Sequence, residues 1–265
     1  MPPATPLYFQ QGISPASASG TPKKRHPKFP KPLLRLELRD LSHAGSRVFL
    51  SKIDVSTVLE EAVGGVLHLL YSPHSVIPPT RSVTLVLRSM SGVAYTTGKD
   101  IDQDHKEIHF STDYVAQISK ERQRSEMLGV IRHEMVHCWQ WNGVSTAPGG
   151  LIEGIADWVR LKSDMVPPHW RKEADGDWDA GYQHTGYFLE YLEQRFGEGS
   201  VMAVNERLRD RKYEEEEFWT YLFGDSVTNL WKDYGQHLRK DVGDASVEDN
   251  KTYKDVVIGR GKDAE

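Results

Sequence analysis

Two histidines four residues apart, His133 and His137 in the segment HEMVH, have a spacing suited to binding a metal. On a helix, residues at this spacing lie on one face about one turn apart, so both imidazoles can bind the same ion. Zinc accepts imidazole nitrogens in this way, at about 2.0–2.1 Å. Glu134 is rotated by about a third of a turn, which directs its carboxylate at a water on the metal instead of at the metal. The segment therefore predicts a zinc-binding helix that also carries a general base.

A catalytic zinc site of this type needs a third protein ligand and an open fourth position. Metzincins take the third ligand six residues after the second histidine, but this chain has Gly143 there, and Gln140 stands where their turn glycine would be. Gluzincins use a glutamate from a following helix, with an aspartate four residues later. Glu153 and Asp157 have that spacing. We therefore expect Glu153 to bind one Zn²⁺ per chain and Asp157 to hydrogen-bond a ligand histidine.

Alternative interpretations of these residues are weaker. A surface helix with two histidines would also contain the HEMVH pattern, but it would not explain two acids in the apolar segment LIEGIADWV, where unpaired carboxylates are costly to bury. His169 follows two prolines in a loop, so nothing fixes its direction towards the metal. His184 is better placed to assist an oxyanion than to bind zinc. Glu153 remains the favoured third ligand.

Three segments around these residues resemble the plant basic secretory protein family, which comprises peptidases of plants, bacteria and fungi. HEMVHCWQWNG followed by APGGLIEGIADWVRLK carries most of the resemblance. WDAGYQHTGYFLEYL is similar to the family's Trp-Asp-x-Gly-Tyr segment, and KEIHFSTDYVA to its substrate-side strand. The resemblance covers about residues 33–240. It implies a gluzincin-like zinc peptidase that acts on a peptide or protein substrate.

The family pattern also suggests a residue that stabilises the oxyanion formed during peptide hydrolysis. Tyr182 matches its Gly-Tyr position and is the first candidate, with His184 and Tyr187 as alternatives and a purely structural tyrosine still open. KEIHFSTDYVA is either an edge strand that aligns the substrate backbone or a plain structural strand. The competing function is a catalytically silent zinc-binding module in defence or interaction.

The chain departs from this family in its charge and its N-terminus. It has 33 Lys and Arg against 38 Asp and Glu, a net charge of −5, which favours neither nucleic acid nor an anionic membrane as partner. The N-terminus lacks the charged and apolar regions of a signal peptide. No apolar run approaches the roughly 18 residues of a membrane span. We expect a monomer that is cytoplasmic or unconventionally exported, although the resembled family is often secreted.

Cys138 is the single cysteine, so the chain forms no intrachain disulfide. It stands where the family usually has an apolar residue. Since it lies next to His137 and points away from the zinc face, we expect a small buried hydrophobe.

The elements that position these residues change character once along the chain. Alternating patterns predict strands at 33–40, 82–89 and 106–114, and helical spacing predicts a helix at 53–71. From Glu121 onward nearly all signals are helical, with ends at Gly143 and Gly197 and N-caps at Ser200 and Ser226. Strands first and helices after predict an α+β fold: a small N-terminal mixed sheet, a zincin-like active-site helix and a helix-rich C-terminal half.

Composition divides the chain into three parts. Residues 1–32 are rich in Pro, Ser, Ala and Lys and predict a disordered arm, whose basic cluster Lys23, Lys24 and Arg25 is read as a solvated linker or an import signal. Residues 33–240 form the predicted zinc metallopeptidase domain. Residues 241–265 are polar and aperiodic and predict a loose tail.

Overall fold

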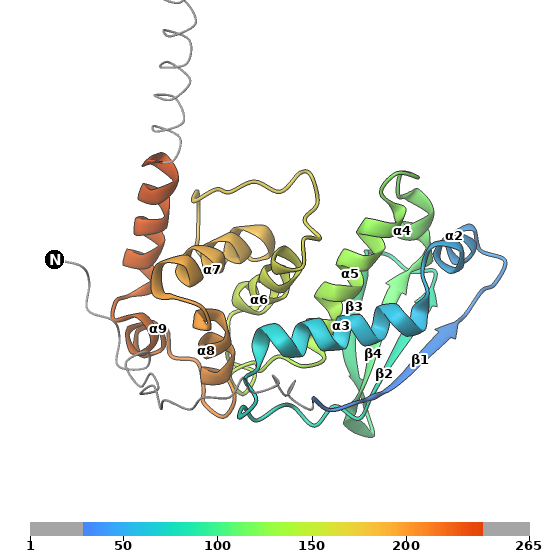
Figure 1. The fold of residues 1–265 in the computed structure, drawn as a ribbon, viewed down its shortest axis with the longest axis horizontal. Coiled ribbons are helices and arrows are strands. Elements are labelled where there is room, and N and C mark those ends of the chain that lie inside the picture. The colour runs from blue at the N-terminus through green and yellow to red at the C-terminus, as the bar shows by residue number, and fades with distance from the viewer. Residues whose placement is uncertain (1–28, 241–265) are drawn as a thin grey trace, which may run out of the picture.

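The computed structural model describes residues 29–240; the predicted tail and all but the last four residues of the predicted arm lie outside this range. Its elements alternate strands and helices first and are helical afterwards (Figure 1). In chain order they are β1 (Leu33–Leu38), α2 (Ala44–Lys52), α3 (Val55–Leu70), β2 (Ser82–Arg88), β3 (Ala94–Lys99), β4 (Asp102–Ser111), α4 (Thr112–Gln117), α5 (Gln123–His137), α6 (Gly149–Lys162), α7 (Tyr182–Phe196), α8 (Ser200–Arg207) and α9 (Glu215–Phe223), followed by helical residues 227–240.

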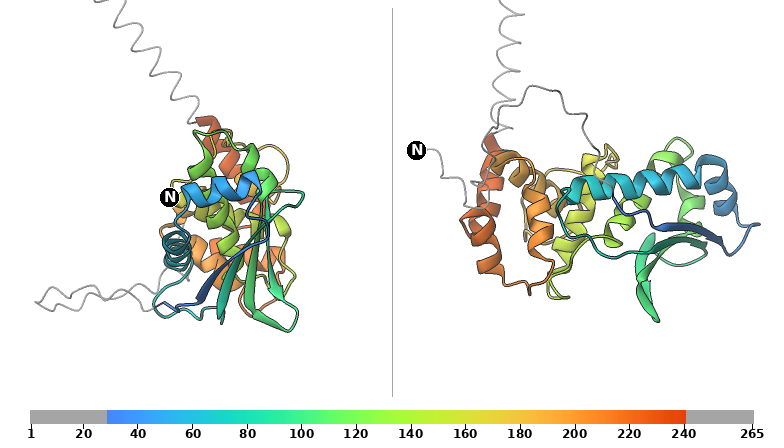
Figure 2. Two further views of the ribbon diagram at one scale, coloured as in Figure 1. Left: turned by 90° about the vertical axis from the view of Figure 1, so that its right-hand side faces the viewer. Right: turned by 60° about the horizontal axis from the view of Figure 1, so that its bottom comes forward.

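The four strands form one mixed sheet in the order β1-β2-β4-β3. Strand β2 pairs in parallel with both β1 and β4. Strand β3 pairs antiparallel with β4 and is an outer strand. Helices α3 and α5 cover one face of this sheet, and α6 to α9 lie beyond its end (Figure 2). The predicted α+β fold with a small mixed sheet is thus confirmed.

Helix α5 is the centre of the molecule. It packs against α3, the strand β3 and α6, and ten of its 15 residues are buried. Alternate β2 residues, Val83, Leu85 and Leu87, are fully buried in the same core as Ile131 and Met135 of α5. A helix buried on several sides can hold polar side chains only where a site requires them. None of the helices in residues 29–240 is long and apolar enough to cross a membrane.

The sequence prediction missed α2, β3 and α4 and misplaced the strand at 106–114. This strand, β4, begins at Asp102 and ends at Ser111, whose side chain accepts a hydrogen bond from Tyr114 N at 3.2 Å and starts α4. Because β4 lies between β2 and β3, the edge-strand interpretation of KEIHFSTDYVA is wrong. The outer strand on this side is β3.

Two of the predicted helix boundaries are confirmed and two are wrong. Gly197 ends α7 at a φ of 107°, and Ser226 accepts a hydrogen bond from Asn229 N at 3.4 Å at the start of the last helical segment. The N-cap of α8 is Gly199, and Ser200 is its first residue. Helix α5 ends at His137, so Gly143 is not its stop; Gly143 instead adopts a φ of 65° in the following turn. Phe29, from the predicted arm, packs partly buried against the core.

Helix α6 begins in close contact with the segment that leads into α7. A Cβ built on Gly150 would lie 1.7 Å from the Asp179 carbonyl oxygen, whereas one on Gly149 meets nothing within 4 Å. We expect Gly150→Ala to destabilise the fold by about 1–3 kcal/mol, the typical result of overpacking. Gly149→Ala is the matched control and should change stability by less than ~1 kcal/mol. Urea unfolding of both variants measures this, and equal midpoints would contradict the close packing.

Candidate functional site

The structure brings three of the predicted site residues together at the junction of α5 and α6. His133 Nε2 lies 3.2 Å from His137 Nε2 and 3.0 Å from Glu153 Oε2, and His137 Nε2 lies 3.7 Å from Glu153 Oε1. One ligand atom from each of these three residues lies within 4.8 Å of the other two. Within residues 29–240, no other group of three or more His, Cys, Asp or Glu is close enough to share a metal ion. The helical spacing and the α5–α6 packing together place the three donors around one point.

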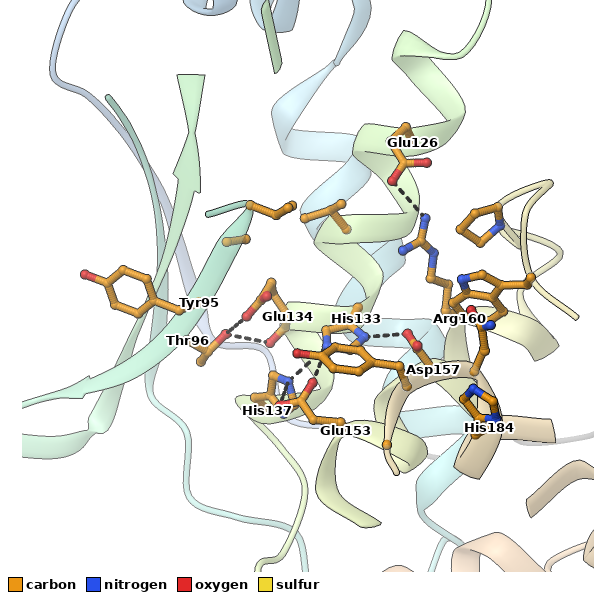
Figure 3. Close-up of a pocket in the computed structure, with 18 of the residues that line it drawn as sticks. Tyr95, Thr96, Glu126, His133, Glu134, His137, Glu153, Asp157, Arg160 and His184 are labelled. Carbon is orange, nitrogen blue, oxygen red and sulfur yellow. Dashed lines mark hydrogen bonds and ion pairs between the residues drawn. The ribbon is translucent and has the colours of Figure 1, made fainter. Parts of the chain in front are cut away.

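Asp157 lies one turn after Glu153 on α6 and fixes the orientation of His133. Its Oδ1 is 2.6 Å from His133 Nδ1, and its side chain is buried, so Nδ1 must donate this bond to the carboxylate. The other ring nitrogen, Nε2, is thereby left facing His137 and Glu153 (Figure 3). Asp157 was predicted to hydrogen-bond a ligand histidine, and that role requires the bond to His133 Nδ1 seen here.

Protonation of the two imidazoles is strongly unequal. Burial opposes protonation of His133, but the hydrogen bonds that its ring donates to the Asp157 and Glu153 carboxylates outweigh it and raise its pKa to about 9. Burial, together with the charge on His133, lowers the pKa of His137 to about 4. Burial disfavours the charged form of Glu153, yet its bond to His133 and the nearby imidazoles hold its pKa below the usual value. Of the two imidazoles, His133 therefore carries the proton at neutral pH, and it lies between the carboxylates of Asp157 and Glu153.

Glu134 lies on the sheet side of the cluster, away from Asp157 (Figure 3). Thr96 of β3 is 2.7 Å from Glu134 Oε2 and 2.9 Å from the Glu134 carbonyl oxygen, so its hydroxyl donates to the base from the sheet. Glu134 is 6 % exposed, and burial raises the pKa of its carboxyl. A carboxylate held in place with a raised pKa suits a general base.

The predicted oxyanion candidates occupy different places. Tyr182 is the first residue of α7, 59 % exposed, with its ring stacked on that of His133 at 6.3 Å. The charge on Glu153 and then burial raise the Tyr182 pKa, which keeps its hydroxyl a donor. His184 lines the same cavity, 3.9 Å from Glu173, whereas Tyr187 packs edge-on against Trp170. His169 also lines the cavity but, like His184, is outside the three-donor cluster.

The three-donor cluster, Glu134, Tyr182 and His184 line one cavity of about 920 Å³ between β3 and the segment that links α6 to α7, and Tyr187 does not line it. Sequence reasoning missed several of its lining residues, including Thr96, Tyr114, Glu126, Arg160 and Trp170. Thr96 was missed because β3 was missed, although the alternating exposure of AYTTGK is typical of a half-buried strand. Glu126 lies seven residues before His133 and so on the same helix face, a signal that was available from spacing.

The α+β chain thus carries a His-Glu-x-x-His helix and a carboxylate donor on the next helix, a set of side chains that could hold a metal ion. Comparison with family models gives a match over residues 31–234 to BSP, described as peptidase of plants and bacteria. The chain therefore belongs to this peptidase family, as its motifs indicated. No curated protein and no solved structure matches the chain.

Proposed function

We propose that the chain is a zinc-dependent peptidase with His133, His137 and Glu153 as metal ligands. The observation that carries this is the spacing of the donor atoms. Tetrahedral zinc with bonds near 2.0–2.2 Å separates its ligands by roughly 3.3–3.6 Å. Here His133 Nε2 lies 3.2 Å from His137 Nε2 and 3.0 Å from Glu153 Oε2, and one donor atom from each residue lies within 4.8 Å of the other two, so the three can close around one zinc.

Zinc in such a site acidifies a water and polarises a carbonyl group. Around it, Glu134 takes the proton of the attacking water and later delivers it to the leaving amine. Thr96 holds the Glu134 carboxylate through Oε2, and Asp157 holds His133 with Nε2 towards the metal. Tyr182 supplies a hydroxyl donor for the oxyanion from the opposite wall. The roles of Thr96 and Asp157 are supported by their contacts with Glu134 and His133.

The outer strand β3 supports a peptide as substrate. It has a strand partner only in β4 among residues 29–240, and Val93 to Thr96 line the cavity beside Glu134. A peptide laid along such an edge gains backbone hydrogen bonds that do not depend on its sequence. This arrangement brings a peptide bond to the metal cluster.

Hydrolysis of a quenched-peptide library tests this function. We expect cleavage that phenanthroline abolishes and added zinc restores, because chelation removes the ion that the three donors hold. A protein that binds zinc but cleaves nothing in the library would instead be a silent zinc-binding module.

Asp157→Asn tests the support of His133. The amide keeps the shape but is a weaker acceptor, so we expect zinc affinity to fall about 10–100-fold. Competition with a chromogenic chelator measures it. Asp164→Asn, an exposed aspartate just after α6, is the control with the same charge change. Unchanged affinity in Asp157→Asn would remove this residue from the site.

A further inference from the structure

A second cavity of about 570 Å³ adjoins the one that holds the metal-binding cluster. Val93 and Tyr114 belong to the walls of both, so the two spaces meet where the chain enters β3. The second cavity is otherwise lined by the loop 89–92 and by two residues of α4, Asp113 and Gln117. An extended peptide that follows β3 past the metal therefore has room to continue beyond it.

Exopeptidases hold a substrate terminus with a fixed charge, because a terminal amine or carboxylate needs a counter-charge near the metal. Apart from the metal cluster, Glu134 and Asp157, which is bonded to His133, the Asp, Glu, Lys and Arg that line these two cavities within residues 29–240 are Glu126, Arg160 and Asp113. Each of the three is engaged by the protein itself.

In the wall, Glu126 forms ion pairs with both Arg160 and Arg122. Glu126 Oε1 lies 3.3 Å from Arg160 and accepts from the Tyr114 hydroxyl at 2.9 Å, while Oε2 accepts from Arg122 at 2.5 Å. Arg160 also donates Nε to the Met165 carbonyl and stacks on Trp170. Both charged side chains are 9 % exposed. A substrate terminus would have to break this network to use either charge.

Asp113, in the second cavity, is 43 % exposed, but both of its carboxylate oxygens have partners within the protein. Its Oδ2 accepts from Ser89 Oγ at 2.6 Å and from Met90 N at 3.1 Å, and its Oδ1 lies 3.2 Å from His43 Nε2. These bonds fix the loop that leads into β3. They leave the carboxylate poorly suited to bind a terminal amine.

Resting on the proposed function, we propose that the chain is an endopeptidase that cleaves internal bonds of an extended polypeptide, with the substrate lying along β3 through both cavities. The reaction adds one water across the peptide bond, which leaves a new carboxylate on one product and a new amine on the other. Neither terminus of the substrate is recognised. Recognition comes from backbone and side chains on both sides of the cleaved bond.

Pairs of peptides with identical sequences, one with free termini and one N-acetylated and C-amidated, test this with the zinc-loaded full chain. We expect the same internal bond to be cleaved in both, as identified by mass spectrometry, with similar kcat/KM. A terminal charge contact would favour the free peptide by at least about tenfold. Stepwise release of single residues from free peptides only would overturn endopeptidase action while leaving zinc hydrolysis intact. If neither peptide is cleaved, the proposed function itself fails.

Val93→Trp tests the path between the cavities. Val93 is 39 % exposed, so a larger side chain can be accommodated at the surface while it obstructs the junction. We expect the ratio of kcat/KM for long against short blocked peptides to fall by about tenfold, since remote substrate residues contribute to kcat/KM. Ile101→Trp, on the same hairpin and fully exposed, is the matched control and should leave the ratio unchanged. An unchanged ratio in Val93→Trp would exclude the second cavity from substrate binding.

Discussion

Replacing Glu134 by glutamine should leave zinc bound and the fold intact but lower kcat by about 10²–10⁴-fold, the usual contribution of a general base. Glutamine is nearly isosteric and can still accept a hydrogen bond from Thr96 through its carbonyl oxygen, so the geometry of the wall is retained. It cannot take a proton from the attacking water. The three donors that we propose as metal ligands, His133, His137 and Glu153, are untouched.

Steady-state hydrolysis of one quenched peptide, together with bound zinc per chain, measures this effect. Glu60→Gln, an exposed residue on α3, makes the same charge change away from the cavity and should behave as the wild type. Near-wild-type turnover in Glu134→Gln would show that this carboxylate is not the base.

The second large effect is expected at Glu153. Glu153→Ala removes the one anionic donor of the cluster and should lower zinc affinity far more than the 10–100-fold expected for a supporting residue such as Asp157. A carboxylate ligand also leaves the site with a net charge of about +1, which balances water activation against product release. Zinc titration of the metal-free protein by chelator competition gives the affinities.

His184→Ala is the informative comparison, because His184 lines the same cavity but lies outside the donor cluster. It should bind zinc nearly as tightly as the wild type. Full-strength binding in Glu153→Ala, or a large loss in His184→Ala, would move the third ligand from α6 to α7 and remove the gluzincin-like assignment.

Local helix geometry explains why the sequence could group these donors. His133 and His137 share a face through i,i+4 spacing, as do Glu153 and Asp157, and neither pair depends on distant parts of the chain. Only the packing of α5 on α6 had to be inferred, and the need to partner two acids in an apolar helix favoured it. The structure confirms that packing: α5 contacts α6, and His133 Nε2 lies 3.0 Å from Glu153 Oε2.

The strand β3 and its contact with Glu134 could not be predicted from the sequence, because both depend on long-range contacts. The strand β3 is six residues long, contains Gly98 and is stabilised by its pairing with β4, so its propensity alone is weak. The contact between Thr96 and Glu134 joins positions 38 residues apart, and no local pattern encodes it.

The end of α5 was misplaced for a similar reason. Gly143 has the positive φ typical of a helix stop, but the helix ends earlier because distant side chains satisfy the carbonyls that follow His137. The Thr80 hydroxyl donates to the Cys138 carbonyl at 2.7 Å, and the Tyr71 hydroxyl donates to the Trp139 carbonyl. Cys138 itself is 1 % exposed, as predicted for a small buried residue.

The most direct test of the account is a stoichiometric zinc titration of the metal-free protein in which bound zinc and peptide hydrolysis are measured on the same samples. Three donors around one point predict that hydrolysis rises in proportion to bound zinc and stops rising at one zinc per chain. Equal hydrolysis before any zinc is added, or a protein that holds one zinc and cleaves no peptide, would contradict a zinc peptidase built on His133, His137 and Glu153.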